Sequence, residues 1–159
     1  MMKDEDLFLG AWVSTLSDYI QITEIKKFIV GHENILLIYG RRLNGVEAGP
    51  FTLDALSPIP LSGDILIKNG FTEILLDDNG NEVASGNKTD IFRYTKNDLV
   101  IEIAVYEPMH ISIGYNTTTP DYEEHGEVSN FCKFNGDKIG VHELQQYLRI
   151  SGIDFEIKL

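Results

Sequence analysis

The sequence predicts an α+β protein that is rich in β-strands. Three observations lead to this class: apolar residues recur at every second position in several segments, Asn-Gly dipeptides mark turns, and only two segments have helical spacing. The chain has 159 residues, of which 43% are hydrophobic and 24% charged, which suits one ordinary domain or two small ones. We therefore expect a small N-terminal SH3-like barrel, followed by an antiparallel sheet that two short helices cover.

Strand patterns in the N-terminal part support the predicted barrel. Apolar and polar residues alternate in residues 19–25, and residues 34–40 form an apolar run with the length of a strand. Asn44-Gly45 follows, a dipeptide typical of tight hairpin turns because both residues tolerate a positive φ. These signals together predict a compact all-β subdomain over residues 1–57.

The same two-residue period recurs in the C-terminal part. Residues 99–105 and 109–115 each place their apolar side chains on one face, which predicts a pair of neighbouring strands. Asn79-Gly80 marks a further hairpin turn, and residues 154–159 alternate as a short terminal strand would. These segments predict the antiparallel sheet.

Two short helices are predicted, at about residues 62–69 and 141–151. In the first, Ser62 suits the N-cap position, and Asp64 complements the positive end of the helix dipole. The second carries apolar residues at i, i+3 and i+7, which place them on one stripe: Val141, Leu144 and Leu148. Both helices are short enough to be covers on a sheet rather than members of a bundle.

The segment that contains Pro58 and Pro60 is the best candidate for a joint between subdomains. It divides the chain into a barrel-like part, residues 1–57, and an α+β part with both helices, residues 58–159. The length of the chain also allows the two parts to pack as one compact unit.

The formal net charge is −12, and it restricts the possible partners. Nucleic-acid affinity depends mostly on Lys and Arg that neutralise phosphates, so direct nucleic-acid binding is not expected. Anionic membranes are disfavoured for the same reason. The composition therefore allows a protein partner with a basic surface, while strand edges allow association between identical chains.

Cysteine usage and hydropathy predict a soluble protein of the cytoplasm. Cys132 is the single cysteine, so an intrachain disulfide is impossible. The first ten residues are acidic where a secretory signal would be basic, and no apolar run reaches the roughly 20 residues that span a membrane.

A polar loop predicted at residues 116–130 holds the densest group of titratable side chains: Tyr122, Glu123, Glu124, His125 and Glu127. Carboxylates beside a histidine favour its protonated form, which suits proton transfer or metal binding. Neighbouring side chains do not converge on one point, however, so a site would need ligands from elsewhere. The alternative is a solvated acidic loop.

Two other patterns fall short of known metal motifs. His142-Glu143 begins like the HExxH helix of zinc proteases, but Gln146 stands where the second histidine is needed. Asp77, Asn79 and Asn81 have the alternate spacing of a calcium loop, yet the glycine is misplaced, and a hairpin turn explains the segment more simply. We therefore predict no catalytic set, no metal and no cofactor.

Two aromatic residues near the first strands, Trp12 and Tyr19, are further interaction candidates. SH3-like barrels bind peptides in aromatic-lined grooves, and these two rings could line such a groove. The competing interpretation, which we favour for Trp12, is a core position.

Three segments carry a resemblance to a known family: DLFLGAWV at residues 6–13, PIPLSGDILIKNGF at 58–71 and VHELQQYL at 141–148. Together they resemble a functionally uncharacterised family of short proteins from gut-dwelling Gram-negative bacteria, their phages and mobile elements. The resemblance covers both ends and the middle of the chain. It implies a genomic setting, such as a phage or mobile element, and no activity, cofactor or partner.

The favoured function is that of a non-enzymatic protein-interaction module that binds through an exposed strand edge or an acidic loop. A first alternative is a small hydrolase or metal-dependent enzyme that uses the loop at residues 122–127. A second alternative is an acidic mimic of nucleic acid, which the net charge of −12 makes conceivable.

Overall fold

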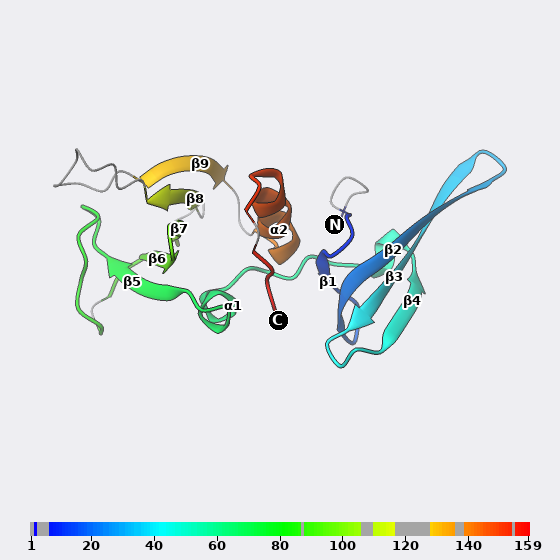
Figure 1. Cartoon of the computed structure of the whole chain (residues 1–159), viewed down its shortest axis with the longest axis horizontal. Coiled ribbons are helices and arrows are strands. Elements are labelled where there is room, and N and C mark those ends of the chain that lie inside the picture. The colour runs from blue at the N-terminus through cyan, green and yellow to red at the C-terminus, as the bar shows by residue number, and fades with distance from the viewer. Residues whose placement is uncertain are drawn as a thin grey trace. The chain divides into compact units, whose positions relative to one another are not determined.

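The computed structural model describes residues 2, 7–86, 88–105, 110–116, 128–135, 139–153 and 155–159. The chain divides into two compact units, each built on an antiparallel sheet (Figure 1). Unit 1 comprises Met1–Leu61, Gly140–Ile157 and Leu159, and unit 2 comprises Ser62–Ile139 and Lys158.

Unit 1 contains a curled sheet of four antiparallel strands in the order β1-β2-β3-β4. The strands are β1 (Trp12–Ser14), β2 (Tyr19–Val30), β3 (Glu33–Arg42) and β4 (Glu47–Phe51). A short 3₁₀ helix, η2 (Leu53–Ala55), and the helix α2 (Val141–Ile150) complete the unit. The turn predicted at Asn44-Gly45 joins β3 to β4, and Gly45 has a φ of 85° there.

The core of unit 1 lies on the sheet face that carries the predicted alternating isoleucines. Its buried members are Met2, Ala11, Val13, Ile20, Ile22, Ile38 and Leu56. Trp12 pairs with Gln21 while Val13 pairs with Ile20, so Trp12 lies on the opposite face of β1. Helix α2 contacts β1, and its predicted stripe of Val141, Leu144 and Leu148 is buried.

Unit 2 contains a five-stranded antiparallel meander in which each strand pairs with the next along the chain. The strands are β5 (Thr72–Leu76), β6 (Ile91–Lys96), β7 (Leu99–Ala104), β8 (His110–Asn116) and β9 (Val128–Asn135). Helix α1 (Gly63–Lys68) contacts β5 and β6, and the Ser62 hydroxyl accepts a hydrogen bond from the backbone N–H of Ile65, as an N-cap does.

The α+β, β-rich class and both predicted helices are confirmed. The division of the chain differs from the predicted joint after residue 57, because α2 groups with the N-terminal sheet. Long-range hydrogen bonds explain this grouping: Val141 N donates to Ile59 O at 2.8 Å, and Trp12 N donates to the Gln145 side chain at 2.9 Å. Such contacts leave no local signal in the sequence.

The C-terminal segment does not form the predicted strand, although its side chains alternate as expected. Ile157 is buried, and its neighbours Glu156 and Lys158 are exposed. Its backbone groups bond to side chains instead of a sheet edge: Ile157 O accepts from the Trp12 indole at 2.8 Å, and Lys158 N donates to Asn69 Oδ1 at 2.8 Å. None of the helices in the described residues has the length and apolar character that a membrane crossing requires.

Asn69, at the C-terminal end of α1, is a buried polar side chain that the sequence patterns did not single out. Its Nδ2 donates to Ile65 O and to Lys158 O, both at 2.7 Å, while its Oδ1 accepts from Lys158 N. All of its hydrogen-bonding groups are thus used to join the end of the helix to the terminal segment.

We expect Asn69→Ala to lower the free energy of unfolding by about 2 kcal/mol, because it removes three part-buried hydrogen bonds, two of them to the backbone of Lys158. Asn69→Asp keeps the acceptor but loses both donors, so it should also be destabilising. The exposed neighbouring residue provides the control, and Lys68→Ala should cost less than about 0.5 kcal/mol. Urea unfolding followed by circular dichroism measures all three, and equal stability of Asn69→Ala and Lys68→Ala would contradict the assignment.

Candidate functional site

The most distinctive surface of unit 1 is the end of the β2–β3 hairpin. β2 has 12 residues and β3 has 10, whereas β1 has 3 and β4 has 5. The short outer strands pair only with residues 19–21 of β2 and with residues 38–41 of β3. The remainder, residues 23–37, extends past them as a two-stranded ribbon, which we call the hairpin arm (Figure 1).

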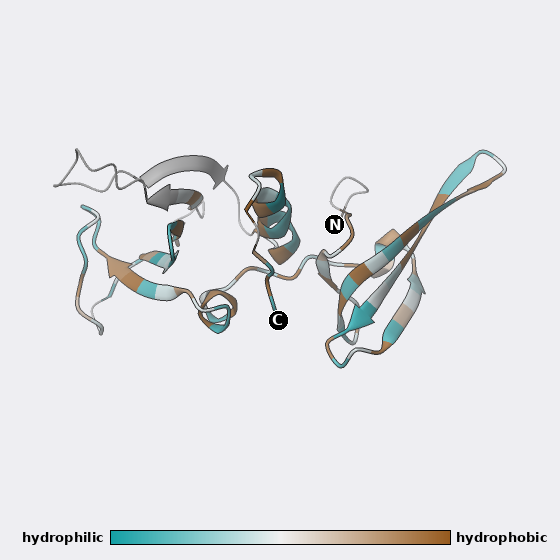
Figure 2. Ribbon diagram, viewed as in Figure 1, coloured by the Kyte–Doolittle hydropathy of each residue, from teal (hydrophilic) through white to brown (hydrophobic). Residues whose placement is uncertain are grey.

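The two faces of the hairpin arm follow from its pairing register. Lys27 pairs with Leu36 on the face that continues the core, whereas Phe28 pairs with Ile35 on the opposite face. That opposite face, which we call the outer face, carries an apolar group next to the tip: Phe28, Val30, Ile35 and Leu37. Hydrophobic segments continue along the hairpin arm in Figure 2.

Three successive apolar residues of the arm are exposed to solvent. Phe28 is 45% exposed, Ile29 75% and Val30 61%. Phe28 and Val30 lie on the outer face, whereas Ile29 lies on the other face of the ribbon. Single exposed apolar residues are ordinary on a protein surface, but an apolar group that shares one face, as Phe28 and Val30 do with Ile35, indicates a docking site. The group lies on a ribbon of two strands, and among the described strands none pairs with either edge of this ribbon next to the tip.

The two edges of the hairpin arm differ in chemical character. Glu24, Lys26 and Lys27 lie on β2, where charged side chains discourage pairing with another strand. Residues 33–37 of β3 read Glu-Asn-Ile-Leu-Leu, with one charge at the tip and no proline. Among the strands that the structure describes, none pairs with this segment of β3 on the side away from β2.

Near the base of the arm, Lys26 forms an ion pair that holds its head group away from the apolar tip. Lys26 Nζ lies 2.9 Å from Glu24 and 4.8 Å from the centroid of the Tyr39 ring. The hydrogen bond and charge of Glu24 raise the pKa of Lys26. The Lys26 head group is thus directed toward Glu24 and Tyr39 at the base, and away from the exposed residues at the tip.

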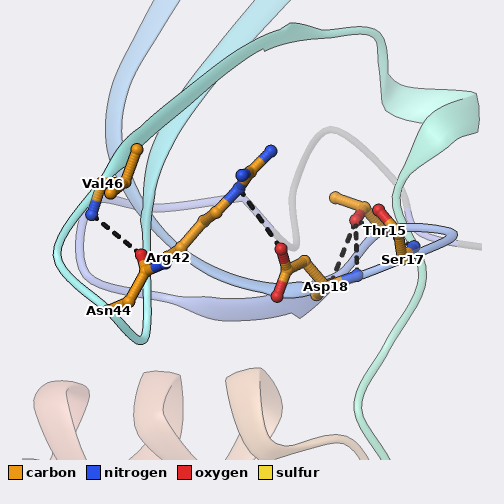
Figure 3. A network of polar contacts seen from close by, with 6 residues as sticks. All are labelled: Thr15, Ser17, Asp18, Arg42, Asn44 and Val46. Carbon is orange, nitrogen blue, oxygen red and sulfur yellow. Dashed lines mark hydrogen bonds and ion pairs between the residues drawn. The ribbon is translucent and has the colours of Figure 1, made fainter.

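The opposite end of the sheet is held by a network of polar contacts (Figure 3). The Thr15 hydroxyl accepts from the backbone N–H of Asp18 at 3.1 Å, and Arg42 Nε lies 3.3 Å from Asp18 Oδ2. Asn44 Oδ1 accepts from Val46 N at 3.1 Å. These contacts define the β1–β2 and β3–β4 turns, so both turns lie at the end of the sheet that is farthest from the arm.

A wide-open cleft of about 450 Å³ also lies in unit 1, between the segment at Phe8, helix α2 and the C-terminal segment. The Arg149 guanidinium stacks over the Phe8 ring at 5.7 Å. Gln145 Nε2 donates to Gly10 O at 3.0 Å, and its Oε1 accepts from Trp12 N. The hydrogen bonds of the Gln145 amide therefore stabilise the fold. The cleft is the groove between these three segments.

The two predicted aromatic candidates have different environments. Trp12 is 8% exposed, and its indole N–H donates to Ile157 O, so it occupies the core position that we favoured from the sequence. Tyr19 is exposed at the start of β2. Of this pair, Tyr19 is the ring that a partner can reach.

The other sequence candidates lie largely outside the described residues. Tyr122, Glu123, Glu124 and His125 all fall in residues 117–127, so the predicted acid–base or metal loop stays a prediction. At the two ends of the predicted loop, Asn116 belongs to β8 and residues 128–130 belong to β9. Within the described parts of the chain, no group of three or more His, Cys, Asp or Glu has the geometry to hold a metal ion.

The segment with calcium-like spacing is a hairpin turn. Asp77 Oδ1 accepts hydrogen bonds from the backbone N–H of Asn81 at 2.8 Å and of Asn79 at 2.9 Å. The Asn81 backbone bond is the main reason that the pKa of Asp77 lies below its usual value. Gly80 has a φ of 80°, as the turn requires. The Asp77 carboxylate stabilises this turn through its hydrogen bonds.

Tyr94 of unit 2 is a tyrosine in the described part of the chain whose pKa is raised. Tyr94 Oη donates to Glu73 at 2.8 Å, and burial followed by this carboxylate raises the pKa of the phenol. A raised pKa keeps the hydroxyl protonated, so Tyr94 acts as a hydrogen-bond donor between neighbouring strands. The side chain therefore has a structural role rather than that of a base.

Fold and surface together define a β-rich α+β protein of two compact units, one of which carries a protruding apolar hairpin arm. Comparison with protein-family models, with curated proteins and with solved structures finds no match in any of the three.

Proposed function

We propose that this chain is a non-enzymatic protein-interaction module and that the hairpin arm is its docking surface. The observation that carries the proposal is the exposure of Phe28, Ile29 and Val30 on a ribbon whose β3 edge no described strand occupies. An exposed strand edge offers main-chain hydrogen bonds, and apolar side chains beside it provide the affinity and specificity of β-augmentation.

The free energy gained by burying the exposed apolar side chains supports this role. Complete burial of a Phe, Ile or Val side chain is worth about 1.5–3 kcal/mol. Much of this free energy is still available for binding a partner, because more than half of the surface of Ile29 and of Val30 is accessible to water. Binding through the arm would cover a surface that the fold itself leaves open.

The charge of the arm also favours a protein partner. Residues 23–37 contain Lys26 and Lys27 against Glu24 and Glu33, so their formal charges, +2 and −2, cancel. The excess negative charge of the chain lies elsewhere, and a basic partner surface would be recognised there. A genomic setting on a phage or mobile element, which the family resemblance implies, is compatible with such a module and stays a prediction.

A peptide library displayed on phage tests the proposal with the full chain as target. We expect it to yield extended apolar peptides whose affinity falls at least tenfold in the double variant Phe28→Thr/Val30→Thr. Threonine keeps the strand propensity and removes the apolar surface. Leu16→Thr is the matched control, because Leu16 is a fully exposed apolar residue outside the arm.

Peptide affinity is measured by calorimetric titration, and circular dichroism checks that each variant keeps its fold. Affinity that is equal in the double variant and in Leu16→Thr would overturn the arm as the docking surface. Failure to select any binding peptide, together with unchanged amide hydrogen exchange in the arm at all protein concentrations, would overturn the proposed function.

A further inference from the structure

We propose that the occupant of the hairpin arm is a second copy of this chain, with the two β3 edges paired antiparallel about a two-fold axis at Ile35. This inference rests on the proposed function, since it takes the arm as the docking surface and names its partner. The dimer would be isologous, with the same residues contributed by both copies.

The difference between the two edges of the arm selects β3. Natural edge strands avoid unwanted pairing by means of lysines, prolines, bulges or short length. β2 has Lys26 and Lys27 in the arm, whereas residues 33–37 of β3 have a single charge, Glu33, at the tip. The β3 edge is therefore the one that is chemically open to another strand.

The register of the hairpin shows why a second copy fits this edge. A two-fold axis at Ile35 sets Glu33 opposite Leu37 of the second copy, and Asn34 opposite its Leu36. No like charges face each other in this pairing. Because Phe28 already pairs with Ile35 within each arm, the outer face gains an uninterrupted apolar row of four side chains: Phe28, Ile35 and the same two residues of the second copy.

Electrostatic repulsion between the copies is small in this arrangement. Each chain has a net charge of −12, but the arm is neutral. Ile35 lies three residues beyond Ile38, where pairing with β4 ends, which is ~10 Å of extended strand. Two sheets joined at Ile35 would thus be ~20 Å apart at these points, beyond the Debye length of about 8 Å at physiological salt.

The contact is short, so the dimer should be weak. A strand pair of five residues on each side is well below the area of a standard stable interface. We therefore expect dissociation in the micromolar range, with a sedimentation coefficient that rises with protein concentration.

Sedimentation velocity of the full chain across the micromolar range tests the inference. Ile35→Lys places two ammonium groups next to each other at the axis, and it should weaken the dimer at least tenfold. Leu16→Lys is the matched control, because Leu16 is a fully exposed apolar residue outside the hairpin arm. A monomer at every concentration, or equal dimerisation of both variants, would overturn the inference.

Disulfide trapping provides a second measurement that does not depend on the folding of Ile35→Lys. In a Cys132→Ser background, Ile35→Cys should form a cross-linked dimer under mild oxidation, because residues at the axis have Cβ atoms about 4.5–5.5 Å apart. Ile29→Cys should not. Equal cross-linking at both positions would contradict the register.

The two proposals fail in distinguishable ways. If peptides bind the arm while the chain stays monomeric, the second copy is wrong and the interaction module stands. If the chain neither dimerises nor binds peptides through the arm, both are wrong.

Discussion

Trp12→Ala is expected to lower the free energy of unfolding of unit 1 by about 3–5 kcal/mol. The side chain is 8% exposed, so its removal leaves a large cavity that the surrounding residues can fill only in part. The change also removes the indole N–H that donates to Ile157 O at 2.8 Å. Urea unfolding monitored by far-ultraviolet circular dichroism measures the loss without relying on tryptophan fluorescence.

Trp12→Phe separates the two contributions. Phenylalanine keeps most of the apolar volume but leaves the Ile157 carbonyl without its donor, so we expect a smaller loss of about 1–3 kcal/mol. Tyr19→Ala is the control, because this ring is exposed on the neighbouring strand and should cost less than about 0.5 kcal/mol. A loss below about 1 kcal/mol for Trp12→Ala would show that Trp12 is not a core residue.

The corresponding change in unit 2 is Ile101→Ala, which should cost about 2–5 kcal/mol. Ile101 has no exposed surface and lies on β7, the middle strand of the sheet. It pairs with Tyr94 on one side and with Ile113 on the other, so truncation removes contacts with both neighbouring strands. Differential scanning calorimetry or chemical unfolding measures the effect.

Ile101→Val provides a graded control, since it keeps the β-branched shape and removes one methylene. It should cost about 0.5–1.5 kcal/mol. If alanine and valine destabilised unit 2 equally, the loss could not be attributed to cavity formation, and the central position of Ile101 in the core would be contradicted.

Local signals explain why so much of the fold could be predicted. The strands around residues 20 and 101, the two Asn-Gly turns and both helices depend on side-chain period and on hydrogen bonds between near neighbours. Ser62 at the N-cap and the buried stripe of α2 are examples. Strands β6 and β9 were not anticipated, because their apolar residues follow no clear alternation.

The candidate site was less predictable than the fold. The sequence directed attention to Tyr122–His125 and to Trp12, while the hairpin arm came to notice only from the structure. The apolar run Phe28-Ile29-Val30 reads as an ordinary part of a strand, since nothing local tells whether a neighbouring strand will cover it. A sequence-based signal does exist in the lysine-free segment at residues 33–37, but it becomes informative only once that segment is known to lie at an edge.

The sequence by itself determined the strand-rich class, the places of the turns and caps, and the inward face of each element, because these depend on interactions within a few residues. The tertiary structure decided which elements share a core and which apolar residues stay uncovered. Helix α2 groups with the N-terminal sheet through contacts more than 100 residues apart in the chain, such as that of Trp12 with Gln145. The arm is exposed because β1 and β4 are shorter than the strands they flank, and a difference in the lengths of separate strands appears only when those strands are paired.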